Sequence, residues 1–111
     1  MKKHIILPVV ILLMVACKAV ILSTPSQTDI DRVNNLYPNY TLIELKEGKK
    51  LYELKCQGCH GLKNPRRESE KKWKKIVPKM VKKAFKKEIE ISKEDEKAIL
   101  KYLITMSSKP K

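Results

Sequence analysis

Apolar residues in the second half of the chain recur at intervals of three and four, and this periodicity limits the fold more than any other feature. An α-helix turns once in about 3.6 residues, so residues at these intervals share one face. One such set is Trp73, Ile76, Val77, Met80 and Ala84, and a second is Ile99, Tyr102, Leu103 and Met106. No segment shows the apolar–polar alternation of a convincing strand. The sequence therefore predicts an all-α fold of three to four short helices.

The first of these helices is expected to begin at Thr41. Thr41 and Glu44, three residues apart, form the pattern of a capping box. An apolar face can then form from Leu45, Leu51, Tyr52 and Leu54. Gly48 weakens a helix at its centre. Its presence indicates that another helix crosses closely at that point.

Proline and serine mark the later helices. Pro78 lies inside the periodic segment 68–85, where it removes a backbone donor and disfavours helical geometry at Val77. We expect either a kinked helix there or two short helices that meet at Pro78. Ser92, with Asp95 three residues later, is expected to cap the last helix.

The stretch LKCQGCHGL, residues 54–62, carries the residues best suited to chemistry. The chain has 111 residues with only one Trp, one Phe and four Tyr, and so small a domain often needs a metal, cofactor or covalent staple. Cys56, Cys59 and His60 fit Cys-x-x-Cys-His, the attachment site of c-type haem. Two thiols one helical turn apart can each form a thioether to one porphyrin, and the adjacent histidine can ligate its iron.

Two other uses of these residues fit less well. A thioredoxin-like dithiol follows a strand in a βαβ unit, and that context is missing. A structural zinc site takes four ligands, whereas Cys56, Cys59 and His60 supply three. The other histidine and cysteine, His4 and Cys17, lie in the leader. Haem attachment is therefore the favoured interpretation of the motif.

The segment LKEGKKLYELKCQGCHGL resembles the N-terminal helix and haem motif of monohaem class I cytochromes c, and EDEKAILKYL resembles their C-terminal helix. The resemblance covers residues 42–104. It implies a small helical bundle around one covalent haem c. In that family the two helices cross near a glycine, which implies that Tyr102 is a neighbour of Gly48.

The middle of the chain is shorter than in ordinary class I cytochromes. WKKIVPKMVKKA is similar to a short bacterial subtype in which a Met follows a Trp within about two helical turns and can be the distal iron ligand. The resemblance thus implies iron ligation by His60 and Met80. Met80 can also simply pack on its helix stripe. Met106, near the chain end, is the other methionine considered, and it fits a core residue better.

Three further residues are candidates for contact with the haem. Arg66 or Arg67 can pair with a haem propionate, or each can be a solvated surface arginine. Trp73 can pack on the haem edge or donate to a propionate, and it can also anchor the core. Asn64 and Pro65 can turn the chain so that a backbone carbonyl accepts the His60 N–H, although an ordinary turn explains them equally well.

The N-terminus reads as a targeting segment. Lys2 and Lys3 precede an apolar run from Ile5 to Ala16, which has the length of a signal-peptide core. Residues 1–16 are therefore expected to be a signal peptide. The sequence LLMVAC resembles the cleavage box of bacterial lipoproteins, with Cys17 as the lipidated residue, while an uncleaved anchor is the alternative. Residues 17–40 are expected to be a tether, and residues 41–111 the cytochrome c domain.

Positive charge is concentrated after the motif. The chain has 25 Lys and Arg against 12 Asp and Glu, and residues 63–87 alone hold twelve Lys or Arg and two Glu. If that segment surrounds the haem, its charge suits docking to an acidic redox partner such as a dehydrogenase, oxidase or reductase. A solvated face, partly drawn to anionic lipid, is the alternative. Export and the lack of a binding motif argue against nucleic acid.

Together these features predict an exported, membrane-tethered single-electron carrier in the periplasm or another extracytoplasmic space, with no enzymatic turnover of its own. The rival is a haem protein with an open distal site, either a peroxidase-like enzyme or a gas sensor, in which Met80 is only structural. A peroxidase would need a distal acid–base residue, and no distal histidine is present.

Overall fold

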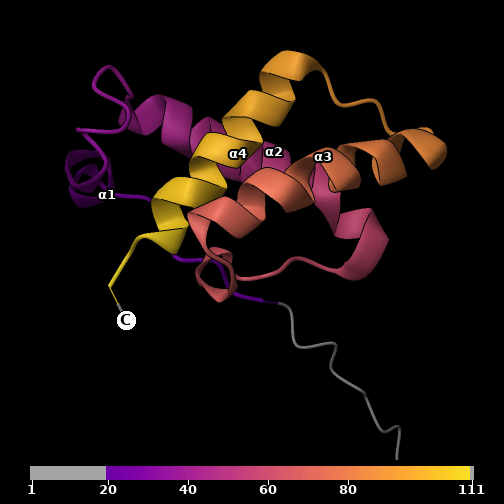
Figure 1. The fold of residues 1–111 in the computed structure, drawn as a ribbon, viewed down its shortest axis with the longest axis horizontal. Helices are drawn as coiled ribbons and strands as arrows, with labels where there is room; N and C mark the ends of the chain where they lie inside the picture. Colours follow the sequence, from indigo (N-terminus) through magenta and orange to yellow (C-terminus); the bar gives the residue numbers. More distant parts are fainter. Residues whose placement is uncertain (1–19, 111) are drawn as a thin grey trace, which may run out of the picture.

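The computed structural model describes residues 20–110, excluding the side chains of residues 58–60. The expected signal peptide and Cys17 lie outside this range. The elements are α1 (Gln27–Arg32), α2 (Leu42–His60), the 3₁₀ turn η1 (Pro65–Arg67), α3 (Glu70–Lys86) and α4 (Lys93–Ser107) (Figure 1). The predicted all-α class is confirmed, since residues 20–110 contain four α-helices and no strand. No helix in this range is long and apolar enough to span a bilayer.

The helices begin where side chains can cap them. At α2 the Thr41 hydroxyl accepts from the Glu44 N–H at 3.2 Å, and the Glu44 carboxylate accepts from the Thr41 N–H at 3.2 Å. This confirms the predicted capping box. The Ser92 hydroxyl caps α4 by accepting from the Asp95 N–H at 3.0 Å, also as predicted. Ser69 caps α3 in the same way, with the Lys72 N–H as donor.

Pro78 lies within a single helix. The segment Glu70–Lys86 is one α-helix with Pro78 inside it, so the two short helices that were considered for this segment do not form. Pro78 itself is exposed, while Trp73, Val77 and Ala84 are buried on the opposite side. Because the ring of Pro78 faces solvent, it does not interrupt the apolar face that α3 turns toward the core.

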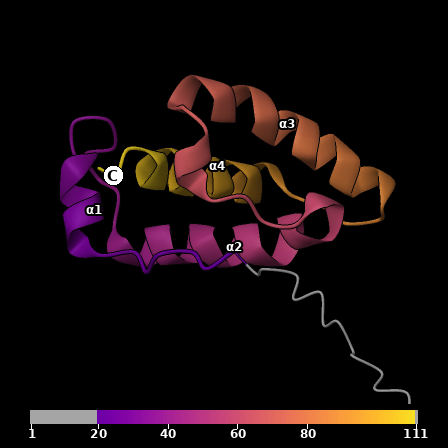
Figure 2. The ribbon, with the colours of Figure 1, turned by 90° about the horizontal axis from the view of Figure 1, so that it is seen from below.

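The close crossing predicted at Gly48 is present between α2 and α4. A Cβ atom on Gly48 would lie 2.6 Å from the Ala98 carbonyl oxygen and 2.8 Å from the Tyr102 Cβ. Only a glycine leaves room for the two backbones at this distance. The position of Tyr102 next to Gly48 is also as predicted. α4 packs against both α2 and α3 and lies between them in Figure 2.

The buried stripe of α2 differs in part from the predicted one. Leu45, Gly48, Tyr52 and Cys56 face inward, whereas Leu54 is 64% exposed and Leu51 is only partly buried. The expected apolar face was therefore wrong for Leu54. Each residue of a helix is rotated about 100° from the one before it, so Leu54 points away from the side that Tyr52 occupies.

Residues 27–40, which the sequence assigned to a tether, contain α1 and pack on the helical core. Ile30, Val33 and Tyr40 belong to the core cluster. Arg32 joins this segment to the end of α4, because its guanidinium donates to the Thr105 carbonyl at 2.9 Å and to the Ser108 hydroxyl at 3.0 Å. The segment is thus part of the same packed unit as the later helices.

Candidate functional site

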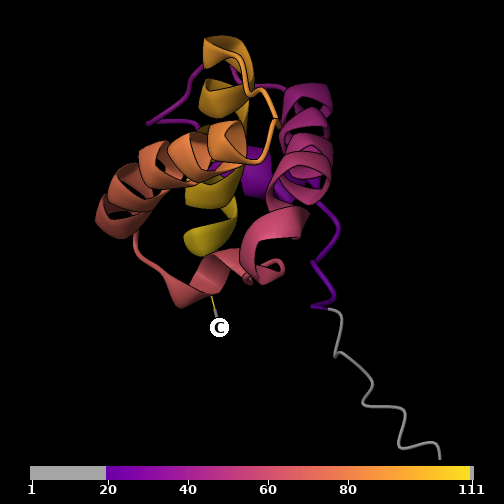
Figure 3. The same cartoon turned by 90° about the vertical axis from the view of Figure 1, so that its right-hand side faces the viewer.

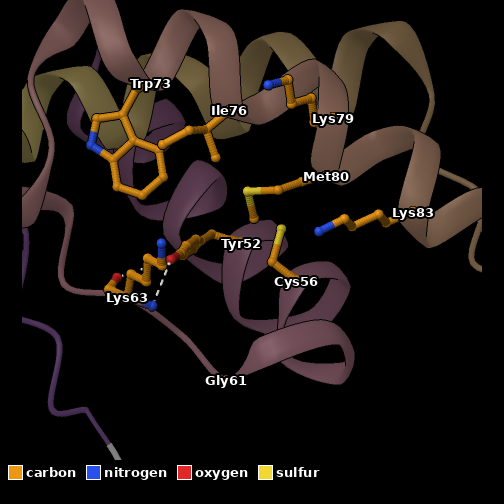
Figure 4. Close-up of a pocket in the computed structure, with 9 residues that line it drawn as sticks. All are labelled: Tyr52, Cys56, Gly61, Lys63, Trp73, Ile76, Lys79, Met80 and Lys83. Carbon is orange, nitrogen blue, oxygen red and sulfur yellow. Dashed lines mark hydrogen bonds between the residues drawn. The ribbon is translucent and has the colours of Figure 1, made fainter.

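A cavity of about 210 Å³ lies between the C-terminal half of α2 and the inner face of α3 (Figure 4). Three residues singled out in the sequence, Cys56, Trp73 and Met80, line it together. The remaining lining residues are Tyr52, Gly61, Lys63, Ile76, Lys79 and Lys83. The cavity therefore joins one cysteine of the motif to the methionine expected as a distal ligand.

Helix geometry explains why these side chains meet. Tyr52 and Cys56 are four residues apart on α2, and Ile76 and Met80 are four apart on α3, so each pair shares a face. Figure 4 shows the Cys56 sulfur pointing toward α3, from which the Met80 thioether reaches into the same space. Cys56 is 6% exposed and belongs to the core cluster. The two sulfur atoms thus occupy opposite walls of one apolar space.

The rest of the motif forms the end of α2. The backbone of Cys59 and His60 continues the helix, while their side chains are outside the description. Residues 56 and 59 therefore lie within one helical turn, the separation that double thioether attachment requires. Gly61 follows with φ of 71°, a left-handed conformation that favours glycine. This glycine ends the helix and starts the segment that leads to α3.

Three hydrogen bonds from two side chains hold that segment. The Tyr52 hydroxyl accepts from the Lys63 N–H at 3.0 Å and donates to the Lys63 carbonyl at 2.9 Å. Burial raises the pKa of the Tyr52 phenol to about 12, although the Lys63 backbone acts in the opposite direction. The Trp73 indole N–H donates to the Pro65 carbonyl at 2.8 Å. This indole N–H is thus already engaged, which disfavours the expected alternative that it donates to a propionate.

Arg66 and Arg67 are not among the cavity-lining residues. Both belong to η1, where the Asn64 side chain accepts from the Arg66 N–H at 3.0 Å. The turn expected at Asn64 and Pro65 is therefore present. The Pro65 carbonyl accepts from the Trp73 indole N–H at 2.8 Å and from the Glu68 N–H at 3.5 Å, so both of its lone pairs are engaged. That a backbone carbonyl of this turn accepts the His60 N–H stays a prediction.

Three lysines line the cavity instead, and sequence reasoning did not single them out. Lys63 comes from the segment after α2, while Lys79 and Lys83 lie one turn apart on α3. None of the described residues that line the cavity carries a carboxylate. Lys79 precedes Met80 directly and Lys83 follows it by three residues. The helical periodicity of α3 could therefore have placed both lysines near Met80, within the basic run already noted. Their charge suits an anionic group at the cavity mouth.

The residues that line the cavity suit the attachment of a haem, but the cavity is small for one. Cys56 supplies a thiol, Met80 a thioether, Trp73 and Ile76 apolar walls, and the lysines a positive edge for carboxylates. The volume of about 210 Å³ is below the ~300–1,000 Å³ typical of small-molecule sites. A haem held here would extend to the surface or separate α3 from α2.

Neither a search for further metal-binding side chains nor a comparison with known proteins identifies what binds at this site. Among the side chains that the structure describes, no group of three or more His, Cys, Asp or Glu is arranged to hold a metal ion. Comparison of the chain with known protein families, curated proteins and solved structures found no match. The motif and the cavity beside it are therefore the observations on which a function has to be argued.

Proposed function

We propose that this protein is a single-electron carrier with one covalently attached haem c. The observation that carries the proposal is the position of Cys56, the first residue of the Cys-x-x-Cys-His motif, on the same cavity as Met80. The resemblance to monohaem class I cytochromes c supports it, because the helix crossing implied at Gly48 and Tyr102 is present in the fold. The all-α bundle fits the same family.

In this proposal Cys56 and Cys59 attach the haem and His60 and Met80 ligate its iron. The bound group supplies a one-electron iron couple, and a methionine ligand raises its reduction potential. Tyr52, Trp73 and Ile76 supply apolar walls, which would keep water from the part of the haem packed against them. If Met80 supplied a ligand in addition to His60, no coordination position would be left for a substrate, and this favours electron transfer over catalysis.

The positive charge of α3 indicates the kind of partner. Beyond its first residue, Glu70, the helix carries no acidic residue, and its exposed lysines are Lys71, Lys72, Lys74, Lys75, Lys79, Lys82, Lys83 and Lys86. Lys79 and Lys83 also line the cavity. An acidic redox partner that docks on α3 would therefore be steered to the side of the molecule where the haem is proposed to be.

The site of action follows from the N-terminal residues and remains part of the proposal. Export by residues 1–16 would place the protein outside the cytoplasm, where thioether attachment and a membrane-linked carrier are both expected. Lipidation of Cys17 would tether it to a membrane surface, with an uncleaved anchor as the alternative.

The direct test is whether the chain carries acid-stable haem. The protein, produced in cells that mature c-type cytochromes, is denatured and extracted with acidified acetone. We expect the haem absorbance to stay with the polypeptide and to be lost in Cys56→Ala/Cys59→Ala. That variant should also lose most of its helical circular dichroism, because the haem would form much of a thin core. Cys17→Ala removes the third cysteine and is the matched control, expected to keep its haem.

Haem that extracts freely from the unaltered protein would contradict the proposal. So would covalent haem in the double cysteine variant. Docking is tested separately by electron exchange with an acidic protein partner at rising ionic strength. Lys75→Glu on α3 should slow the exchange at low salt, whereas Lys46→Glu, exposed on α2, should change it little.

A further inference from the structure

We propose that Tyr52 and Trp73 are positioning residues that fix residues 63–65 between α2 and α3, and so set the distance across the cavity from the attachment motif to Met80. The inference rests on the proposed function. It assigns a role to two side chains that would neither attach the haem nor ligate its iron. It also explains why both use their polar groups on the same short piece of main chain.

Tyr52 holds this piece to α2. Its side chain is 1% exposed, and its hydroxyl serves both backbone groups of Lys63, the N–H at 3.0 Å and the carbonyl at 2.9 Å. These contacts close the loop that begins at Cys56, one helical turn after Tyr52, and that contains Cys59 and His60. One hydroxyl therefore determines where the chain emerges from the motif.

Trp73 holds the same piece to α3. Its side chain is fully buried, and its indole N–H donates to the Pro65 carbonyl at 2.8 Å. Met80 is seven residues further along α3, two helical turns away on the same face. Figure 3 shows the chain passing from the end of α2 to the start of α3 through this piece.

The two residues also contact each other. Their rings meet edge to face, with centroids 6.5 Å apart and planes at 89°. Tyr52 therefore joins residues 63–65 to the face of α2 that carries Cys56. Trp73 joins the same residues to the face of α3 that carries Met80. Because all three of these hydrogen bonds go to main-chain atoms, the side chains at positions 63 and 65 matter less than Tyr52 and Trp73.

Loss of either contact should therefore weaken the hold on Met80 more than it weakens the fold. If the segment moves, the spacing between the motif and Met80 is no longer fixed, and an added ligand can compete better for the iron. Tyr52→Phe tests this because it removes one hydroxyl and keeps the ring. The matched control is Tyr40→Phe, since Tyr40 is also buried but its hydroxyl has no hydrogen-bond partner among the described residues, and it does not line the cavity.

Two measurements on the haem-loaded protein separate a positioning role from general stability. The first is hydrogen exchange of the Lys63 amide, expected to be about tenfold faster in Tyr52→Phe and unchanged in Tyr40→Phe. The second is displacement of the distal ligand by added imidazole, expected at about tenfold lower concentration in Tyr52→Phe alone. Trp73→Phe, which removes the indole N–H, should ease displacement in the same direction.

The outcomes distinguish the inference from the function on which it rests. Covalent haem with a methionine ligand, together with equal behaviour of Tyr52→Phe and Tyr40→Phe, overturns the inference and leaves the electron-carrier proposal standing. A protein without covalent haem, or without a methionine ligand, overturns both. Faster Lys63 exchange without easier displacement shows that Tyr52 holds the loop but does not position Met80, and it too overturns the inference.

Discussion

Substituting Gly48 by alanine has two opposing effects on the stability of the fold. In an isolated helix the change stabilises by about 1 kcal/mol, because alanine is the better helix former. In this fold the new Cβ would meet the Ala98 carbonyl oxygen at 2.6 Å and the Tyr102 Cβ at 2.8 Å. Neither atom is the end of a flexible side chain, so α2 and α4 have to move apart by several tenths of an ångström.

That separation affects the central helix pair of the fold. A gap of about 0.5–1 Å removes a quarter to a half of the dispersion energy of each affected contact. Overpacking a buried site typically costs about 1–3 kcal/mol even where side chains can adjust. Here the obstacle includes backbone, so we expect the cost to exceed the gain in helix propensity. The net prediction is a loss of about 2 kcal/mol in the free energy of unfolding.

Urea unfolding followed by circular dichroism measures this loss. Lys46→Ala, at an exposed position of the same helix, is the control, expected within about 0.5 kcal/mol of the unaltered protein. The urea dependence of the free energy should be similar for all three proteins, so that midpoints can be compared. A Gly48→Ala protein as stable as the original, or more stable, would refute the argument from the crossing.

Two further predictions concern the contact between α1 and α4. The Asp29 carboxylate is 1% exposed and lies 2.9 Å from the Arg32 guanidinium. Arg32→Met removes this cation and should lower the free energy of unfolding in urea by about 2 kcal/mol. Lys74→Met breaks the exposed pair with Glu70 and should cost less than about 1 kcal/mol, so equal losses in the two variants would contradict this account. Burial acts to raise the pKa of Asp29, but the Ser26 backbone N–H and Arg32 outweigh it and lower the pKa below its ordinary 3.8. The ionised group therefore stabilises the fold fully above that ordinary value and less as pH falls through the lowered folded-state pKa. Acid titration of unfolding should show a shallower decline in Asp29→Asn, and an unchanged decline would contradict the assignment.

The sequence predicted the features that depend on neighbours along the chain. Thr41 and Ser92 start helices because a short polar side chain caps N–H groups only two or three residues away. Gly48 predicted a close helix crossing, because glycine weakens a helix interior and is favoured there only where another helix leaves no room for a Cβ atom. Met80 was expected to be the distal ligand from the family resemblance, with packing on the apolar stripe as the alternative, and its place in the cavity lining is compatible with both.

What the sequence did not predict depends on contacts between distant residues. Tyr52 reaches Lys63 and Trp73 reaches Pro65 through backbone atoms, which every residue has, so no pattern of side chains marks the pairing. Residues 27–40 lacked a clear period because α1 is short, and its place is set by Arg32 reaching α4. Leu54 illustrates the opposite case, where an apolar residue stays exposed because its helix turns it away from the core.

The measurement that tests the central claim most directly is the visible spectrum of the haem-loaded protein, oxidised and reduced, beside Met80→Leu and Met106→Leu. Both substitutions replace a sulfur-containing side chain with one of similar size. Met80 lines the cavity, whereas Met106 is buried in the core and is not among the lining residues.

The account predicts a low-spin spectrum with the weak far-red band of sulfur bound to ferric iron. Met80→Leu should lose that band, and Met106→Leu should keep it. A high-spin spectrum that Met80→Leu leaves unchanged would contradict the account, because the distal position would then be open and an enzyme or gas sensor would replace the electron carrier.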